Sequence, residues 1–165
     1  MSTDAAAGHS PEDLAALVPG TWRIRATNSP LWLTGERTSP TYSYTIVSSD
    51  PLRLTVDARW LAADGSEKHL PGTVRWKNGV FVWRGRWLRS FLRSRWAITG
   101  SSDDGNIVVI IRFDKSAVTP RGIDVIVREG VKVDDPRARV ARSAARFGLT
   151  PEDFASLAWL PADTH

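Results

Sequence analysis

Hydrophobic and polar positions alternate with a period of two through most of this chain. In the segment 52–62, every second residue from Leu52 to Trp60 is apolar, and the residues between them are charged or carry a hydroxyl group. This pattern is typical of β-strands with one buried side and one solvent-facing side. Eight segments fit a strand, and we expect them at 21–28, 41–48, 52–62, 69–76, 80–87, 94–100, 107–113 and 123–128.

Turn sequences separate these segments. Asn78-Gly79 and Asp104-Gly105 favour tight hairpins, and Asp50-Pro51 and Asp64-Gly65 mark further turns. Consecutive strands joined by hairpins form an antiparallel up-and-down sheet. Because closure removes exposed strand edges, eight such strands predict an all-β, eight-stranded antiparallel barrel. A β-sandwich is the competing architecture.

Both ends of the chain carry helical patterns. Ser10-Pro11 is an N-cap followed by proline at the first helical position, and Pro19-Gly20 ends this short N-terminal helix. After Asp135-Pro136, apolar residues recur at helical spacing as far as Gly148. Two further elements, a capped turn at Thr150 and a short strand at Trp159-Leu160, complete the tail. We expect residues 1–9 to be disordered and residues 10–165 to form a single domain.

Composition narrows the compartment and the chemistry. The 165 residues include no cysteine, which excludes disulfides and thiolate chemistry. The first residues lack the basic and apolar regions of a signal peptide, and no apolar run is long enough to span a membrane, so we expect a cytoplasmic protein. The net charge of +4 is carried by 18 Arg and 4 Lys. Coding bias is one explanation, but Arg is also the better partner for carboxylates, phosphates and aromatic faces.

Two regions of the sequence resemble a known family. Gly20-Thr21-Trp22, which opens the first strand directly after a short helix, is similar to the Gly-x-Trp motif of lipocalins. The last strand ends in Arg128, and the segment after it, with Phe147-Gly148-Leu149 and Trp159, resembles the end of bacterial lipocalins in the calycin superfamily. One departure is the family's middle motif, a Thr-Asp-Tyr-like turn, which is replaced by Ser101-Ser102-Asp103-Asp104-Gly105 without an aromatic residue.

The resemblance covers residues 20–160 and carries several structural expectations. It implies a ligand-binding barrel with the C-terminal helix packed outside. It also implies that Gly20, Trp22 and Arg128 meet at the closed end, with the Arg128 guanidinium on the indole face of Trp22 in a structural cation–π contact. Well-known bacterial lipocalins are lipid-anchored, so the absence of a cysteine means that any membrane contact of this chain would be reversible.

The inward-facing strand positions are the candidates for a ligand cavity. They are Ile24, Ala26, Tyr42, Tyr44, Val56, Ala58, Val74, Trp76, Phe81, Trp83 and Ile98. An eight-stranded barrel is barely wide enough for one small ligand, so the alternative is that these side chains simply fill the core. The small residues Ala26, Ala58, Gly72 and Gly85 favour a cavity. We therefore predict a binding or carrier protein for an apolar or amphipathic, fatty-acid- or lipid-like small molecule.

A second set of residues belongs to segments expected at the open end of the barrel. This mouth set is Trp32, Trp87, Arg89, Phe91 and Arg93. Exposed aromatic residues among arginines could guide an anionic amphiphile or contact an anionic membrane surface reversibly. They could instead cover the barrel or form a dimer contact, so the chain is expected to be a monomer or a homodimer.

Other functions find little support in the sequence. The three histidines, His9, His69 and His165, fit no nucleophile, metal-ligand or phosphate-binding pattern, and we expect no cofactor and no metal. Haem ligation by His69 and nucleic-acid binding are weak alternatives, since a net +4 is modest. The main alternative to a carrier is a small-molecule isomerase or cyclase that uses Tyr or Asp in the same cavity.

Overall fold

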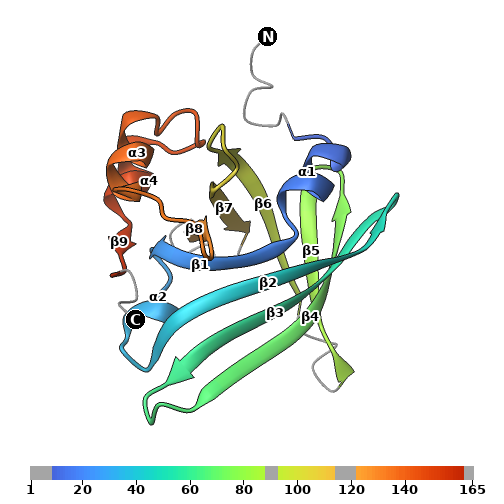
Figure 1. The fold of residues 1–165 in the computed structure, drawn as a ribbon, viewed down its shortest axis with the longest axis horizontal. Coiled ribbons are helices and arrows are strands. Elements are labelled where there is room, and N and C mark those ends of the chain that lie inside the picture. The colour runs from blue at the N-terminus through green and yellow to red at the C-terminus, as the bar shows by residue number, and fades with distance from the viewer. Residues whose placement is uncertain (1–8, 88–92, 114–121, 162–165) are drawn as a thin grey trace.

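The computed structural model describes residues 9–87, 93–113 and 122–161, which form a closed antiparallel barrel (Figure 1). The barrel strands are β1 (Gly20–Thr27), β2 (Arg37–Ser49), β3 (Leu52–Ala62), β4 (Glu67–Lys77), β5 (Val80–Gly85), β6 (Arg93–Ser101), β7 (Ile107–Phe113) and β8 (Gly122–Arg128). Each strand pairs with the next, and β1 pairs with both β8 and β2, which closes the ring. The predicted eight-stranded up-and-down barrel is confirmed.

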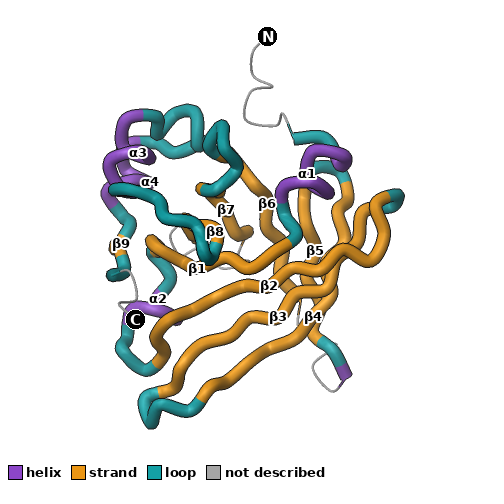
Figure 2. The backbone as a smooth tube through the Cα atoms, viewed as in Figure 1, coloured by secondary structure: helices purple, strands orange, loops and turns teal. Residues whose placement is uncertain are grey.

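Short helices and one additional strand flank the barrel (Figure 2). They are α1 (Pro11–Leu17), α2 (Pro30–Leu33), α3 (Pro136–Arg142), α4 (Pro151–Ala155) and β9 (Ala158–Trp159), which pairs with the end of β1. The Ser10 hydroxyl accepts a hydrogen bond from the Asp13 amide, and the Asp13 carboxylate accepts one from the Ser10 amide, so a capping box starts α1 at the predicted N-cap residue.

Most elements differ from their predicted bounds by one or two residues, and strand β2 and the C-terminal helix differ by more. Strand β2 begins at Arg37, four residues earlier than expected, and β5 ends at Gly85 instead of residue 87. The C-terminal helix ends at Arg142 because the backbone leaves the helical region at Ser143, where φ is −133°. Turns then carry the chain to Gly148. Of the stretch predicted to be disordered, residues 1–8 lie outside the described residues, but His9 donates or accepts a hydrogen bond with the Ser101 hydroxyl at 3.1 Å.

The barrel wall is buried on both sides at β7 and β8. Alternate residues of these strands, such as Val108, Ile110 and Ile126, pack into the barrel interior. The residues between them, such as Val109 and Val125, pack outward against the α3–β9 segment. Two buried faces explain why these two strands read as nearly continuous apolar runs while β3 and β4 alternate.

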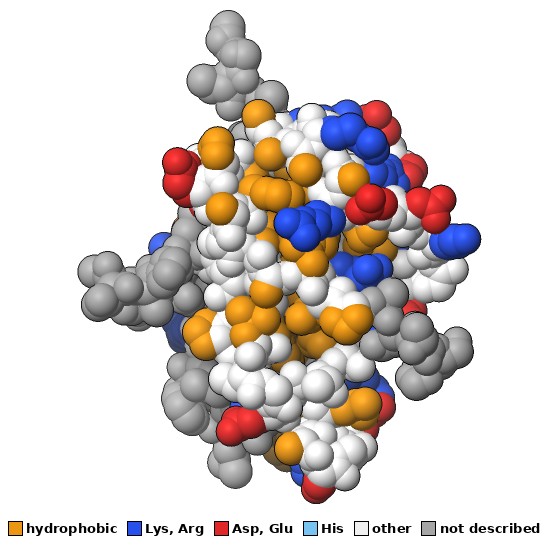
Figure 3. Space-filling view, turned by 90° about the vertical axis from the view of Figure 1, so that its left-hand side faces the viewer, with side chains coloured by type: hydrophobic (Ala, Val, Ile, Leu, Met, Phe, Trp, Pro, Cys, Tyr) orange, Lys and Arg blue, Asp and Glu red, His pale blue; other side chains and the backbone are white. Residues whose placement is uncertain are grey.

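The opposite wall, formed by β2 to β5, keeps its outer face toward solvent, as the polar residues of its alternating pattern predict. Figure 3 shows the other side of the molecule, where the α3–β9 segment covers the barrel. Apolar side chains lie in the middle of this view, and charged side chains lie mostly around them. The C-terminal segment therefore shields one wall only, and the ends of the barrel determine how its interior is reached.

A β-bulge changes the direction of one predicted cavity residue. The β1–β8 register shifts between Ile24 and Ala26, so Ile24 packs inside the barrel while Ala26 packs outward with the α3–β9 segment. The prediction that Ala26 lines the cavity is therefore wrong. The alternation did not reveal this bulge because the outer face of β1 is also buried at Ala26, where β9 pairs with the strand, so an apolar residue fits either face.

Candidate functional site

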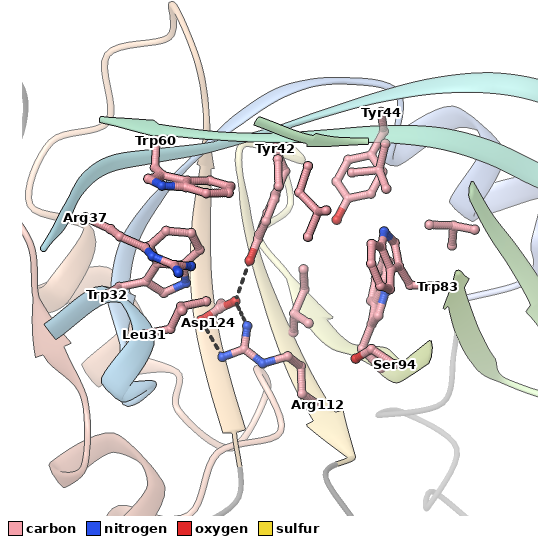
Figure 4. A pocket seen from close by; sticks show the side chains of 16 residues that line it. Leu31, Trp32, Arg37, Tyr42, Tyr44, Trp60, Trp83, Ser94, Arg112 and Asp124 are labelled. Atoms are coloured by element: carbon pink, nitrogen blue, oxygen red, sulfur yellow. Dashed lines mark hydrogen bonds and ion pairs between the residues drawn. The ribbon is translucent and has the colours of Figure 1, made fainter. Parts of the chain in front are cut away.

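A pocket with a volume of about 270 Å³ lies inside the barrel, toward the end where α2 is located (Figure 4). Most of its wall is apolar or aromatic. Its lining residues are Leu31, Trp32, Arg37, Tyr42, Tyr44, Val56, Ala58, Trp60, Leu70, Val74, Trp83, Ser94, Trp96, Ile110, Arg112 and Asp124. They come from α2 and from every barrel strand except β1.

A buried ion pair lies at the centre of this wall. Asp124 on β8 and Arg112 on β7 are diagonal neighbours on the inner face, and the guanidinium donates to both carboxylate oxygens at 2.6 and 3.2 Å. The Asp124 side chain is 1% exposed, and it also accepts hydrogen bonds from the Thr27 hydroxyl at 2.8 Å and the Tyr42 hydroxyl at 3.3 Å. Four donors therefore neutralise and fix this carboxylate.

Both tyrosines of the chain line the pocket. Burial raises the pKa of Tyr42, and the negative charge of Asp124 beside it acts in the same direction. Burial likewise raises the pKa of Tyr44 well above its ordinary value. Since both phenols stay protonated at neutral pH, Tyr42 acts as a hydrogen-bond donor to Asp124, with its oxygen still able to accept.

Three side chains form the α2 side of the pocket. The rings of Trp32 and Trp60 meet edge to face with centroids 5.9 Å apart. The Arg37 guanidinium lies over the Trp60 ring, 5.0 Å from its centroid. Figure 4 shows these three residues together with Leu31 on one side of the ion pair, and Trp83 and Ser94 on the other.

The opposite side of the pocket depends on a glycine. A Cβ at Gly72 on β4 would overlap the indole of Trp83 on β5, which pairs with Val74, two positions further along β4. Trp83 can therefore lie flat across β4 only because residue 72 has no side chain. Gly72 was predicted to leave empty space in the barrel, but in the structure Trp83 occupies that space.

The closed end of the barrel is packed and holds a different arginine. The Arg128 Cζ lies 4.1 Å from the centroid of the Trp22 ring, the contact that the resemblance implies. The guanidinium donates to the carbonyl oxygens of Leu17 at 2.8 Å and Pro19 at 3.1 Å, and burial lowers its pKa. A Cβ on Gly20, whose φ is +125°, would lie 2.8 Å from Arg128 Nη1. Glycine therefore allows this close approach.

Of the predicted cavity residues, some line the pocket and others are packed in the core. Six of the eleven line the pocket: Tyr42, Tyr44, Val56, Ala58, Val74 and Trp83. Four are packed in the interior outside the pocket: Ile24, Trp76, Phe81 and Ile98. Phe81, for example, stacks on Trp96 with ring centroids 4.4 Å apart, which closes the interior below the pocket. The period-two alternation predicted which side chains point into the barrel. It did not predict which of them line the pocket and which are packed in the core.

The predicted mouth residues do not form one cluster in the described residues. Trp32 was expected to be exposed, but α2 turns it inward, where it is 6% exposed and lines the pocket. Trp87 is 87% exposed. Arg93 lies on the outer wall of the barrel, in a groove with Arg53, Arg75 and Arg84. Arg89 and Phe91 lie outside the described residues.

Sequence reasoning predicted seven of the lining residues and missed the others, among them Arg37, Trp60, Arg112 and Asp124. A signal for the ion pair was present, because Asp124 interrupts the apolar run of the strand expected at 123–128, and Arg112 follows the apolar run of the strand expected at 107–113. A buried charge needs a partner, so the two strands could have been searched for one. Arg37 carried no comparable signal, because it precedes the expected start of its strand.

The pocket offers little for catalysis or metal binding. In residues 9–87, 93–113 and 122–161, no cluster of three or more His, Asp or Glu residues could hold a metal ion. His69, the histidine considered for haem, is exposed on the outer wall and contacts the Asp57 carboxylate at 3.0 Å. Among the helices of these same ranges, none has the length and apolarity needed to cross a membrane.

A closed eight-stranded barrel with one packed end and an internal pocket toward the other is the lipocalin fold. Solved structures agree. Lobster apocrustacyanin A1 superimposes with a TM-score of 0.69 at 13% identity, over 99% of this chain and 87% of that chain. Japanin from Rhipicephalus appendiculatus, solved with cholesterol, has a TM-score of 0.61 at 13% identity, over 90% and 95%. The Rhodnius prolixus amine-binding protein, solved with tryptamine, has a TM-score of 0.56 at 13% identity, over 86% and 76%.

Comparison by sequence gives no such match. No protein-family model matches the chain, and no curated protein sequence matches it. The likeness is therefore one of fold, and the function must be argued from the pocket itself.

Proposed function

We propose that this protein binds an apolar or amphipathic small molecule in the pocket and acts as a carrier. The observation that carries the proposal is the combination of a mostly apolar wall with a few fixed polar groups, which is characteristic of small-molecule sites. A volume of about 270 Å³ is near the lower limit for such sites, which favours a compact or short-chain ligand. The proteins of similar fold that were solved with cholesterol and with tryptamine make this use of the barrel plausible.

The polar groups of the pocket favour binding over catalysis. A general base needs an available lone pair and a pKa near the working pH. The Asp124 carboxylate already accepts four hydrogen bonds, and the raised pKa of Tyr42 keeps that phenol protonated. Neither group is suited to take a proton from a bound molecule, so we favour a carrier over an isomerase or cyclase.

The test is binding of N-phenylnaphthylamine, an uncharged fluorescent probe, to the purified protein. We expect saturable binding that Ala58→Phe abolishes, because a phenyl ring at this position fills the pocket. The matched control is Ala63→Phe, the same substitution at an exposed hairpin position. Binding that is equal in both variants, in folded protein, would contradict the proposal.

The carrier and enzyme alternatives separate in a second experiment. Native mass spectrometry of the protein as purified, followed by solvent extraction, identifies any molecule that remains bound. Recovery of an unchanged amphiphile after prolonged incubation with the protein supports a carrier. Conversion of that molecule into a product, lost in Ala58→Phe, would support an enzyme instead.

A further inference from the structure

The pocket contains a buried hydrogen-bond donor that makes no well-formed hydrogen bond. Trp32 is 6% exposed, and its Nε1 makes no hydrogen bond of full geometry with the described residues, although it lies close enough to the Tyr42 hydroxyl to lower the pKa of that phenol weakly. The contrast with Trp22 is direct, because the indole Nε1 of Trp22 donates to the Val18 carbonyl oxygen at 2.9 Å. Buried polar groups are nearly always paired in folded proteins, and exceptions tend to mark functional positions. Trp32 Nε1 is therefore available to a stronger acceptor supplied from outside the chain.

An unneutralised positive charge lies on the same side of the pocket. Arg37 and Trp32 both contact Trp60, Arg37 through its guanidinium over the ring and Trp32 at its edge. No carboxylate in the described part of the chain pairs with Arg37. The two arginines and the single aspartate that line the pocket leave it with one net positive charge. A ligand with one negative charge would make the loaded pocket neutral.

The remaining polar groups do not compete for this role. Arg112 is already engaged by Asp124, and the Asp124 oxygens accept from Arg112, Thr27 and Tyr42. A ligand ammonium group would find this carboxylate occupied and would lie near Arg37. The pocket thus presents a donor and a positive charge on the side of α2 and the start of β2, and aromatic side chains at Tyr44 and Trp83 on the other side (Figure 4). Trp96 also belongs to the aromatic lining.

We infer that Trp32 and Arg37 bind the anionic oxygen of a carboxylate head group, with the apolar body of the ligand directed toward Trp83 and Trp96. The inference rests on the proposed function and defines its ligand class as organic acids with a compact or medium-chain apolar body. It also assigns recognition of the negative charge of the ligand to Arg37, in place of the predicted Arg89 and Arg93. An indole N–H and a guanidinium together recognise a carboxylate oxygen through charge-assisted hydrogen bonds.

The experiment compares three ligands with the same chain and different head groups: decanoate, decanol and decylamine. Each displaces N-phenylnaphthylamine from the wild-type protein at neutral pH. We expect decanoate to bind most tightly and decylamine most weakly. Trp32→Phe and Arg37→Gln should each weaken decanoate by about 10- to 100-fold, the range for hydrogen bonds to charged groups, and decanol by less than about 3-fold.

Two controls separate the inference from general pocket damage. Arg93→Gln removes a guanidinium from the outer wall and should leave all three affinities unchanged. Retained decanol binding in Trp32→Phe and Arg37→Gln shows that the pocket is intact.

The possible results are distinguishable. If decanol and decanoate bind equally well, if decylamine binds as tightly as decanoate, or if both variants weaken decanol and decanoate equally, the inference is wrong and the carrier function stands. If neither the probe nor any of the three compounds binds to the folded wild-type protein, the proposed function itself fails.

Discussion

Two partly buried arginines lie at opposite ends of the barrel interior, and they are stabilised in different ways. Arg128 at the closed end donates to the backbone carbonyl oxygens of Leu17 and Pro19 and covers the Trp22 ring, without a carboxylate partner in the described residues. Arg112, on the wall of the pocket, pairs with the Asp124 carboxylate. The first arrangement joins α1 to the barrel and leaves no open space. The second provides a neutral, rigid polar surface beside a cavity.

This difference indicates what each end of the barrel does. The backbone carbonyl oxygens and the indole face contact Arg128 only while the surrounding chain is folded. The contacts of Arg128 therefore contribute to the stability of the closed end. The Arg112–Asp124 pair is satisfied internally and exposes its edge to the pocket. We therefore expect changes at the closed end to affect stability alone and changes at the pocket to affect both stability and binding.

The largest effect is expected for Asp124→Asn. The substitution keeps the shape of the side chain but leaves the Arg112 charge uncompensated in the interior, which typically costs about 3–5 kcal/mol. Urea denaturation followed by circular dichroism measures the loss in the free energy of unfolding. The double variant Arg112→Met with Asp124→Leu should recover much of it, because a buried pair replaced by apolar residues is often neutral. A loss below about 1 kcal/mol in Asp124→Asn would show that the pair is not structurally important.

Arg128→Met should have the next largest effect. Methionine keeps an apolar stem over Trp22 but loses the charged hydrogen bonds to the two carbonyl oxygens, so we expect a loss of about 2–3 kcal/mol in the free energy of unfolding. Arg23→Met is the matched control, because Arg23 forms an exposed ion pair with Glu129, worth about 0–1 kcal/mol. N-phenylnaphthylamine binding should be unchanged in both variants. Loss of probe binding in folded Arg128→Met would contradict the separation of the two ends.

A smaller effect should appear at alkaline pH. The raised pKa values of Tyr42 and Tyr44, the two tyrosines of the chain, mean that the folded state resists ionisation of both phenols. Their contribution to stability is complete below the ordinary tyrosine pKa of about 10 and decreases as the pH rises above it, because only the unfolded chain ionises there. We expect the unfolding free energy to decrease above this pH, and to decrease less steeply in Tyr42→Phe.

The tyrosinate absorbance band provides the direct readout of this prediction. In the folded protein, the band should be absent at pH values where the urea-unfolded protein already shows it. A folded protein whose tyrosinate band rises near pH 10, the ordinary value, would show that the pocket is hydrated enough to solvate a phenolate.

The sequence predicted the barrel well because its evidence is local. Period-two alternation and turn residues identify strands one at a time, and hairpin connections then fix their order. The sequence did not predict where open space lies, because that depends on distant side chains. Trp83 covers Gly72, and Phe81 stacks on Trp96, only in the assembled sheet.

Charge partners were harder to predict for the same reason. Asp124 and Arg112 meet through the register between β7 and β8, which the sequence does not specify. Arg37 and Trp32 both contact Trp60, because α2 turns the chain inward before β2 begins. A four-residue helix of this kind falls below the length at which helical periodicity is detectable.

The central claim is that ligand binds at one end of the barrel and that the closed end has a structural role only. The eight tryptophans of the chain provide its most direct test. Each indole N–H gives its own proton–nitrogen NMR signal, which single Trp→Phe variants assign. On addition of decanoate, we expect the signals of Trp32, Trp60, Trp83 and Trp96 to move, with Trp32 moving most. The signals of Trp22 and Trp159 should stay in place. Movement of Trp22 or Trp159 while the four pocket signals remain unchanged would contradict the account.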